Sequence, residues 1–393
     1  MRPMPAAQVP PFLPHAAFFL HGFEMGGAQR MTLALAGALA AAGARADIVV
    51  ASGEGPLRDE VPDGVRVVEV GTLGRVLTKR RHRVRLAVPG LASWLRRARP
   101  DVLVGAANHA ALAAVWAHAL ADVPGQRLVL RATNPLGRED GGNRLKRLAA
   151  RRFFPRADAL IAVSPAVAAD HLSLVPGLAG RVEVIPEPAV DAGFGDRLAR
   201  DLLTGPAGTP PPGDGPLVLA IGRMVAQKDF TTLLRAVALL RRRHPVRLVL
   251  VGDGPERAAL EAEAARLGLG GAVLFAGALS NPLPWLRQAD CLALSSRWEG
   301  LGIVAIEAMA AGVPVAATDC DGTRFVLDGG RYGPLSPPGD PERLADAIED
   351  VLETPLPPDV LRRRAADFSV EGVLPAYLDL FARLGGGAAR RVA

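Results

Sequence analysis

Residues 291–317 read CLALSSRWEGLGIVAIEAMAAGVPVAA, and this stretch contains the pattern that decides the fold. Cys291–Leu294 and Val313–Ala317 are apolar runs of strand length, and Val304–Ala311 between them has the composition of a helix. A strand, a helix and a strand in this order form a βαβ unit, whose two strands lie parallel in one sheet. The stretch therefore predicts an α/β protein.

The same alternation of short apolar runs and helical segments continues in both directions from this stretch. Strand candidates in the first half of the chain are Ala16–Leu20, Ala46–Ala51, Val65–Val70, Asp101–Val104, Arg127–Arg131, Ala159–Val163 and Val182–Ile185. Those in the second half are Leu217–Ile221, Arg247–Val251, Ala272–Phe275, Cys291–Leu294 and Val313–Ala317. Between the two series, Gly205–Pro216 reads GPAGTPPPGDGP, which is typical of a linker or surface loop.

A chain of 393 residues is longer than one hydrophobic core usually organises. We therefore predict two Rossmann-like doubly wound domains, residues 1–190 and 191–367, followed by a helix over 368–385. Ligands of such sheets bind outside the carboxyl ends of the strands. We expect the two domains to face each other across a ligand-binding cleft.

The composition argues against several classes of protein. Cys291 and Cys320 form no CxxC pair, so we expect no disulfide framework, no metal site and a reducing, cytoplasmic compartment. The sequence has no uninterrupted run of about twenty apolar residues, so we expect no membrane-spanning helix. The proline-rich N-terminus disfavours a signal peptide. Aromatic residues make up 5% of the chain and do not interleave with its basic runs, which argues against nucleic-acid binding.

The charge is unevenly distributed. Residues 1–190 carry a net charge of +9 and the remainder −3, with basic runs at 79–85, 96–99 and 144–152. Two interpretations stay open. The runs are either a solvated face of an arginine-rich protein or a peripheral contact with an anionic membrane, which gains about 1 kcal/mol per basic residue near the headgroups.

The loop and helix within 295–314 carry the most informative polar residues. Glu299 lies in a loop with Gly300 and Gly302, and Glu307 follows eight positions later in the helix. Glycines and free amides at a helix N-terminus suit phosphate oxygens. Because carboxylates would repel phosphate, we expect both glutamates to face sugar hydroxyls, which they bind strongly. A glycosidase acid/base pair is the competing use of two carboxylates.

Positive charge follows another predicted strand, in the sequence Ile221-Gly222-Arg223-Met224-Val225-Ala226-Gln227-Lys228. Gly222 would let a ligand approach the strand end. Arg223 and Lys228 would neutralise a diphosphate, and this effect grows as charge develops on a leaving group. The alternative is an ordinary exposed loop.

Three further predicted strands are followed by turns that contain glycine. Gly26 and Gly27 open a helix in HGFEMGGAQR, residues 21–30, which has neither the Walker nor the GxGxxG spacing. In the second half, Gly252-Asp253 and Phe275-Ala276-Gly277 are candidates for contact with a base and ribose. Each of these turns could also serve the fold alone.

Together these segments resemble the retaining glycosyltransferases of family 4, which have the two-domain GT-B fold. The likeness runs from about Ala16 to Leu384, and its most specific part is the spacing of Glu299 and Glu307. The final helix resembles the one that in this family crosses back to the first domain. One departure is Glu187-Pro188, where relatives carry asparagine before the proline.

The resemblance implies a role for each matching position. Arg223 and Lys228 would hold the diphosphate, Glu307 the ribose, and Glu299 the donor sugar, together with the backbone of Gly300, Leu301, Gly302 and Ile303. Gly26 and Gly27 would approach the donor from the first domain. His109 is read either as a general base or as an ordinary helix-start residue.

The sequence therefore predicts a glycosyltransferase that needs no cofactor and no metal. Its donor would be a nucleoside diphosphate sugar, with UDP favoured, and its acceptor a saccharide or lipid-linked glycan of the bacterial envelope. A nucleotide-sugar epimerase, a phosphorylase and a non-catalytic nucleotide-sugar-binding module are the alternatives. The missing GxGxxG disfavours an oxidoreductase.

Overall fold

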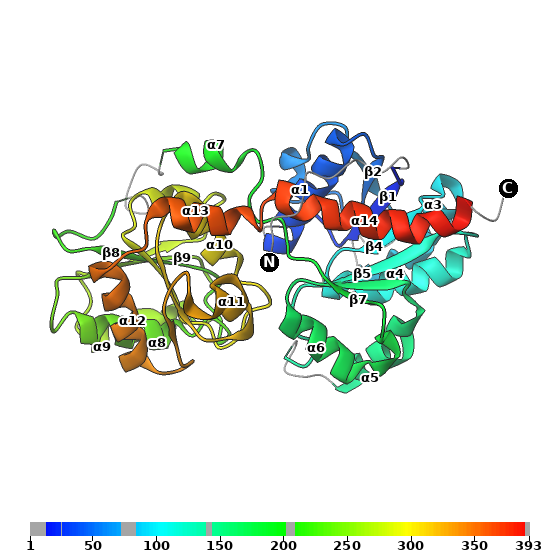
Figure 1. The fold of residues 1–393 in the computed structure, drawn as a ribbon. Helices are drawn as coiled ribbons and strands as arrows, with labels where there is room; N and C mark the ends of the chain where they lie inside the picture. The colour runs from blue at the N-terminus through cyan, green and yellow to red at the C-terminus, as the bar shows by residue number, and fades with distance from the viewer. Residues whose placement is uncertain (1–12, 25, 72–83, 139–143, 202–208, 390–393) are drawn as a thin grey trace. The chain divides into compact units, whose positions relative to one another are not determined.

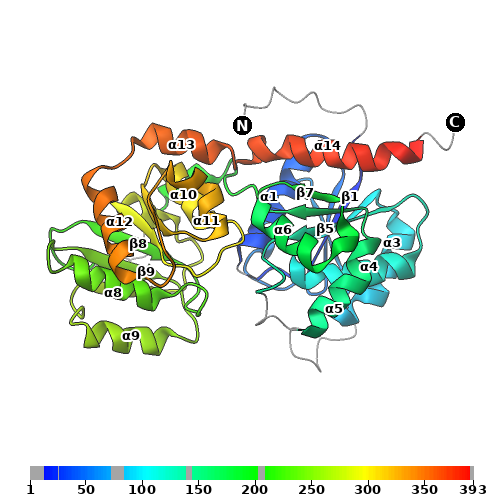
Figure 2. The same cartoon turned by 60° about the horizontal axis from the view of Figure 1, so that its bottom comes forward.

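The computed structural model describes residues 13–24, 26–71, 84–138, 144–201 and 209–389, which form two compact units (Figures 1 and 2). Unit 1 combines the chain up to Pro188 with the chain from Val370 onward, and unit 2 extends from Ala189 to Ser369. Each unit is an α/β layer structure with helices packed against one sheet.

Unit 1 is built on a seven-stranded parallel sheet with the order β3-β2-β1-β4-β5-β6-β7. Its strands are β1 (Ala16–Leu20), β2 (Ala46–Val50), β3 (Arg66–Glu69), β4 (Val102–Gly105), β5 (Arg127–Ala132), β6 (Ala159–Ala162) and β7 (Val182–Val184). Its longer helices are α1 (Gly27–Ala41), α3 (Val88–Ala98), α4 (Asn108–Ala121), α5 (Arg144–Phe153), α6 (Pro165–Leu174) and α14 (Val370–Ala389). The central strands β1 and β4 are apolar on both faces, as a sheet covered by helices requires.

The C-terminal helix belongs to unit 1, although the chain passes through all of unit 2 before reaching it. Val373, Tyr377 and Phe381 lie on the face of α14 that joins the core of β1, β2 and α1. The spacing of these three residues brings them to one side of the helix. The helix begins at Val370, within the predicted range 368–385, and extends to Ala389.

A buried ion pair links three segments of unit 1. Arg131 on β5 donates from Nη2 to Glu187 Oε1 (2.9 Å) and from Nη1 to the Thr32 hydroxyl on α1 (2.8 Å). The exposed fractions of the Arg131 and Glu187 side chains are 0% and 4%. Burial raises the pKa of Glu187, and Arg131 offsets part of that rise. The glutamate that departs from the family pattern thus has a dedicated partner.

Unit 2 contains a six-stranded parallel sheet with the order β10-β9-β8-β11-β12-β13. Its strands are β8 (Leu217–Ile221), β9 (Arg247–Val251), β10 (Val273–Gly277), β11 (Cys291–Leu294), β12 (Val315–Thr318) and β13 (Leu335–Ser336). Its helices are α7 (Phe194–Ala199), α8 (Phe230–Leu240), α9 (Arg257–Arg266), α10 (Ile303–Ala311), α11 (Asp321–Val326), α12 (Pro341–Glu353) and α13 (Pro358–Ala366). The two cysteines are free and buried.

The chain order reverses at one place in each sheet. In unit 1, β1 lies between β2 and β4, and in unit 2, β8 lies between β9 and β11. The two strands beside such a reversal send their following loops in opposite directions, which opens the sheet edge to ligands. The loops after β1 and β4, and after β8 and β11, are therefore the places to examine for chemistry.

None of the helices in the described ranges combines the length and the apolar character that crossing a bilayer requires.

Candidate active site

In unit 2, a lysine and a glutamate meet at the carboxyl ends of β8 and β11. Lys228 Nζ donates to Glu299 Oε1 at 2.5 Å, and the Ser296 hydroxyl donates to the same oxygen at 2.6 Å. The exposed fractions of the Lys228 and Glu299 side chains are 18% and 8%. A carboxylate this buried needs a donor. In the structure, Lys228 is one of the two donors to this carboxylate.

Hydrogen bonds hold the two loops together on both sides of this ion pair. The Ser295 hydroxyl donates to the Lys228 carbonyl at 2.7 Å, and the Gln227 side chain donates to the Trp298 carbonyl at 3.0 Å. From β12, the Thr318 hydroxyl donates to the Ser296 carbonyl at 2.6 Å. These three bonds all end on backbone carbonyls, so they fix the two loops that carry Lys228 and Glu299 relative to each other.

Glycines allow the strand ends to approach each other. Gly252 has φ +141°, and a Cβ at this position would lie 1.9 Å from the Gly222 carbonyl oxygen, so only glycine fits. Its amide donates to the Gly277 carbonyl at 2.8 Å. A Cβ on Gly222 would lie 3.2 Å from Lys228 Cε, so the lysine stem runs along this glycine. These turns after β8, β9 and β10 therefore form one packed group.

The loop that carries Glu299 leads directly into α10. Gly302 is the N-cap residue of this helix with φ +88°, and Gly300 and Leu301 before it are buried. Gly322 packs against the same loop, since a Cβ there would lie 2.8 Å from the Glu299 carbonyl oxygen. Glu307 lies about one turn into α10 and is half-buried. The helix N-terminus and the ion pair thus share one edge of the sheet.

The remaining residues predicted for unit 2 lie on neighbouring turns. Arg223 is exposed two residues beyond the end of β8, and Asp253 is exposed beyond the end of β9. Phe275 on β10 and Ile303 at the start of α10 are half-buried. Thus the structure pairs Lys228 with Glu299 and leaves Arg223 exposed to solvent.

Unit 1 brings two histidines together at its own reversal point. His21 follows β1 and His109 is the second residue of α4, and their ring centroids lie 6.5 Å apart in an edge-on arrangement. His21 Nδ1 and Glu24 Oε1 are separated by 2.5 Å. Gly26 is the N-cap residue of α1 and Gly27 its first residue, and both are exposed. The predicted residues of unit 1 therefore lie on the two loops that flank the reversal.

The sequence patterns did not single out several residues of these sites. Ser295, Ser296 and Thr318 hold the lysine and glutamate loops, and His21 and Glu24 lie beside His109. The available signal was their position at the end of a strand or within four residues after it. Since many strand-end residues serve the fold alone, that position does not distinguish them.

Comparison with known proteins decides the family. The "Glycosyltransferase Family 4" model matches residues 25–191, and the "Glycosyl transferases group 1" model matches residues 215–354. The lipopolysaccharide core biosynthesis glycosyltransferase LpsE of Rhizobium meliloti (strain 1021) is 31% identical over 375 residues, which cover 92% of this chain and 97% of LpsE. This chain belongs to glycosyltransferase family 4.

Solved structures show that this glycosyltransferase has the GT-B fold. The apo form of the lipopolysaccharide outer core galactosyltransferase WaaB is 18% identical with a TM-score of 0.66, covering 95% of this chain and 99% of WaaB. Anabaena HepE in complex with UDP-glucose is 20% identical with a TM-score of 0.67, covering 96% of this chain and 99% of HepE. The predicted fold and the predicted enzyme class are both confirmed.

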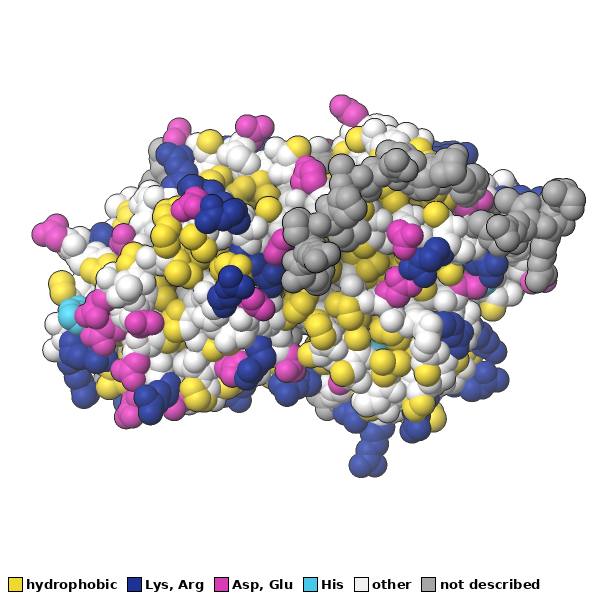
Figure 3. All heavy atoms as spheres, in the orientation of Figure 1, with side chains coloured by type: hydrophobic (Ala, Val, Ile, Leu, Met, Phe, Trp, Pro, Cys, Tyr) yellow, Lys and Arg dark blue, Asp and Glu magenta, His cyan; other side chains and the backbone are white. Residues whose placement is uncertain are grey.

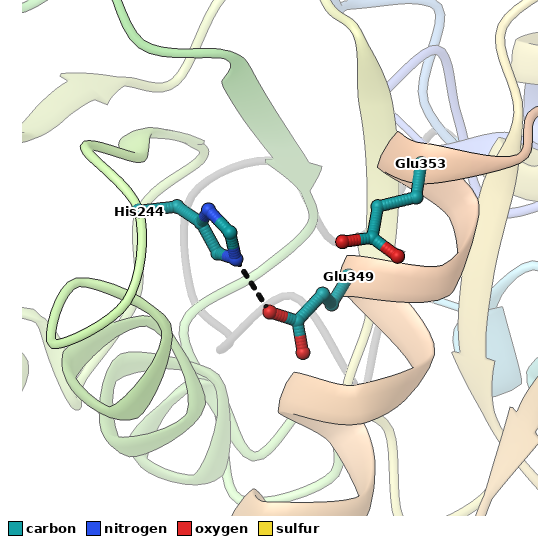
Figure 4. A group of neighbouring side chains, drawn as sticks. All are labelled: His244, Glu349 and Glu353. Carbon is teal, nitrogen blue, oxygen red and sulfur yellow. Dashed lines mark hydrogen bonds and ion pairs between the residues drawn. The ribbon is translucent and has the colours of Figure 1, made fainter.

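A further group of polar side chains in this glycosyltransferase lies away from the candidate site. His244, Glu349 and Glu353 each offer a ligand atom within 4.8 Å of the others (Figure 4). Glu349 already pairs with His244 through Oε1 (2.6 Å) and with Arg243 through Oε2 (2.7 Å). His244 precedes β9, at the amino edge of the sheet, whereas Lys228 and Glu299 follow carboxyl ends. The group is not part of the candidate active site.

The surroundings of His109 predict a characteristic pH dependence for the glycosyltransferase. Desolvation by nearby protein atoms is the largest effect on His109, and it lowers the pKa of this residue below 6.5. The neighbouring His21 lowers the pKa further, although His109 keeps an exposed surface. Glu24 raises the pKa of His109, and Lys146 lowers it. A base works in its neutral form, so we expect kcat/KM to be maintained at pH 6.5 and to fall at lower pH, as His109 becomes protonated.

Replacing His109 with glutamine is expected to lower kcat about a hundredfold, a usual loss for a general base. It should also remove the fall in kcat/KM at low pH. The pH profiles of kcat/KM for both proteins test the role. If kcat/KM of the variant falls at low pH as in the wild type, His109 is an ordinary helix-start residue. His118 at the other end of α4 offers a control, since His118→Gln should leave the profile unchanged.

Proposed function

We propose that this glycosyltransferase moves a sugar from a nucleoside diphosphate sugar, with UDP as the favoured nucleotide, and retains the anomeric configuration without a metal. The observation that carries the proposal is the partly buried ion pair between Lys228 and Glu299 at the reversal point of unit 2. Without a donor the two charges satisfy each other. With a donor, each gains a partner of its own.

The diphosphate supplies the partner for Lys228. Its ammonium group, the exposed Arg223 and the backbone amides at the start of α10 are three sources of positive charge for a diphosphate in this proposal. As the bond to the sugar breaks, negative charge grows on the leaving phosphate. Positioned cations then stabilise the transition state more than the ground state. Two such cations give a chemical reason for proposing that no metal is needed.

The sugar and ribose supply partners for the two glutamates. Once Lys228 turns to the phosphate, the Glu299 carboxylate is left with the Ser296 hydroxyl and can accept from sugar hydroxyls. In this proposal, Glu307 accepts from the ribose. HepE, which shares the fold, binds UDP-glucose, and this supports the choice of UDP.

The acceptor is proposed from relatives rather than from the site. LpsE and LpsD of Rhizobium meliloti (strain 1021), which are 31% and 32% identical to this chain over the matched residues, act in lipopolysaccharide core biosynthesis. We propose that this enzyme extends a lipid-linked saccharide of the bacterial envelope on the cytoplasmic side. Two free, buried cysteines are compatible with a reducing compartment.

Replacing Glu307 with alanine tests the nucleotide site. Hydrogen bonds to a charged group contribute about 1.5–3 kcal/mol each, so loss of the ribose contact should weaken UDP binding about tenfold to a hundredfold. Calorimetric titration of UDP, and then of a panel of UDP-sugars, measures the effect. Glu342→Ala, at the exposed start of α12, is the matched control.

Equal UDP affinity in Glu307→Ala and the wild type would overturn the nucleotide role. Product analysis by NMR decides between retention and inversion of the anomeric centre. Loss of turnover in EDTA, restored by a divalent cation, would contradict the metal-free mechanism.

A further inference from the structure

Helix α5 exposes two leucines to solvent on unit 1. Leu145 and Leu148 are 77% and 66% exposed, the highest values among the large hydrophobic side chains of the described residues. The helix itself is held to the body of the unit. Phe153 packs edge-on against Trp116 of α4 at 5.8 Å, Ala150 is buried, and Arg147 donates to the Gly137 carbonyl at 3.1 Å. The two leucines are therefore exposed even though α5 is packed against the rest of the unit.

The exposed residues of α5 form one continuous face. Arg144, Leu145, Leu148, Arg151 and Arg152 are all exposed, and we call them the α5 face. At about 100° per residue they span roughly 120° of the helix surface, on the side away from Ala150, with Leu148 near the centre. Apolar side chains on this face are thus flanked by arginines.

Positive charge dominates the surroundings of this face. Arg144–Phe153 contains four arginines and one lysine and no acidic residue. Arg152 and Arg156 lie over the Phe153 ring, 5.7 and 5.1 Å from its centroid. Figure 3 shows Lys and Arg side chains projecting at the lower edge of unit 1, where Figure 1 draws α5.

The basic run at 96–99 does not carry the same features. Residues 79–83 lie outside the described residues. Within 96–99, Arg96 donates to the carbonyls of Leu120 and Ala121, and Arg97 donates to the Ser93 hydroxyl. Arg96 and Arg97 therefore take part in contacts within and between α3 and α4, whereas Arg144, Arg151 and Arg152 of the α5 face are exposed.

We propose that the α5 face docks this glycosyltransferase on a bilayer surface that contains anionic lipids. The arginines match lipid phosphates, and leucines among them match the boundary between headgroups and acyl chains. Nucleic acid would match the charge but not the leucines, since single-stranded binding uses aromatic platforms. The docking needs no donor or acceptor, so it can be tested apart from the proposed function.

Sedimentation of the full chain with vesicles measures the docking. We expect binding to vesicles of phosphatidylglycerol and phosphatidylcholine, weaker binding at high salt, and little binding to phosphatidylcholine alone. Replacing Arg144, Arg151 and Arg152 with glutamine should lower the partition coefficient about fivefold per arginine, or about a hundredfold in total. Leu148→Ser should lower it about tenfold.

Matched variants separate this face from general effects of charge. Arg331, Arg343 and Arg363 of unit 2 are 73%, 70% and 69% exposed, so replacing them with glutamine changes the net charge equally. We expect this control to bind within about twofold of the wild type, and Leu148→Met, which keeps an apolar helix-forming residue, to do the same. Circular dichroism and melting temperature show whether each variant is folded.

Three results would overturn the proposal. The first is failure of the folded wild type to bind anionic vesicles. The second is an equal loss in both arginine variants, which would reduce the effect to net charge. The third is that Leu148→Ser leaves vesicle binding unchanged but converts an oligomer into a monomer in gel filtration, which would make the face an interface between copies.

Discussion

Lys228→Met is expected to lower turnover about a thousandfold, the upper end of the loss when one preorganised transition-state contact is removed. Methionine keeps the length and the apolar stem that runs along Gly222, but it carries no charge. In the proposed mechanism, the diphosphate would then leave without the ammonium group that lies 2.5 Å from Glu299. Steady-state kinetics with a UDP-sugar and its acceptor measure the loss.

The same substitution removes a partner of the buried Glu299, so folding must be measured separately. Lys228→Met with Glu299→Gln removes both charges and should regain the stability lost by the single variant, without regaining activity. Lys228→Arg keeps the charge and should retain part of the activity. If Lys228→Met has kcat within threefold of the wild type, Lys228 has no role at the leaving group.

Arg131→Met is expected to lower the free energy of unfolding by about 3–5 kcal/mol, the range for breaking a buried ion pair. The variant leaves Glu187 buried, 4% exposed, without its cation. The pKa of Glu187, which burial already raises, should then rise further. A raised pKa in the folded state disfavours the charged carboxylate. The deficit should therefore be smallest at low pH, where Glu187 is protonated in both states, and should grow as the pH rises from the pKa of the unfolded state towards the raised pKa of the folded state. Urea unfolding across a pH series tests this.

A double variant and a surface pair provide the controls. Arg131→Met with Glu187→Met removes both charges and should recover most of the lost stability, since an apolar replacement of a buried pair is often neutral. Arg383 and Glu183 form an exposed pair in the same unit, with side chains 53% and 33% exposed. Arg383→Met should cost less than about 1 kcal/mol. Equal effects of Arg131→Met and Arg383→Met would show that burial does not set the strength of the pair.

Local patterns predicted most of the elements of both sheets. Ala16–Leu20, Leu217–Ile221, Arg247–Val251 and Cys291–Leu294 are strands with the predicted bounds. The two-residue strand β13 was not predicted, and the helix α4 was anticipated only by reading His109 as a helix-start residue. α4 is rich in alanine and apolar on most sides, so it has no amphipathic period to detect. Strand β13 is too short to form a recognisable run.

The sequence by itself determined the fold class, the family and the positions of Glu299, Glu307, Arg223 and Lys228. These follow from apolar periods and fixed spacings, which are properties of short segments. The pairing of Lys228 with Glu299, 71 positions apart, depends on β8 lying next to β11. Likewise, His21 meets His109 because β1 lies next to β4.

Only the tertiary structure also decided how buried charges are satisfied. Glu187 has no local partner, and its arginine comes from a strand 56 positions away. Which strand lies beside which is set by packing over the whole sheet, and no short segment encodes it. The sequence thus names the groups that can react, and strand order determines which of them meet.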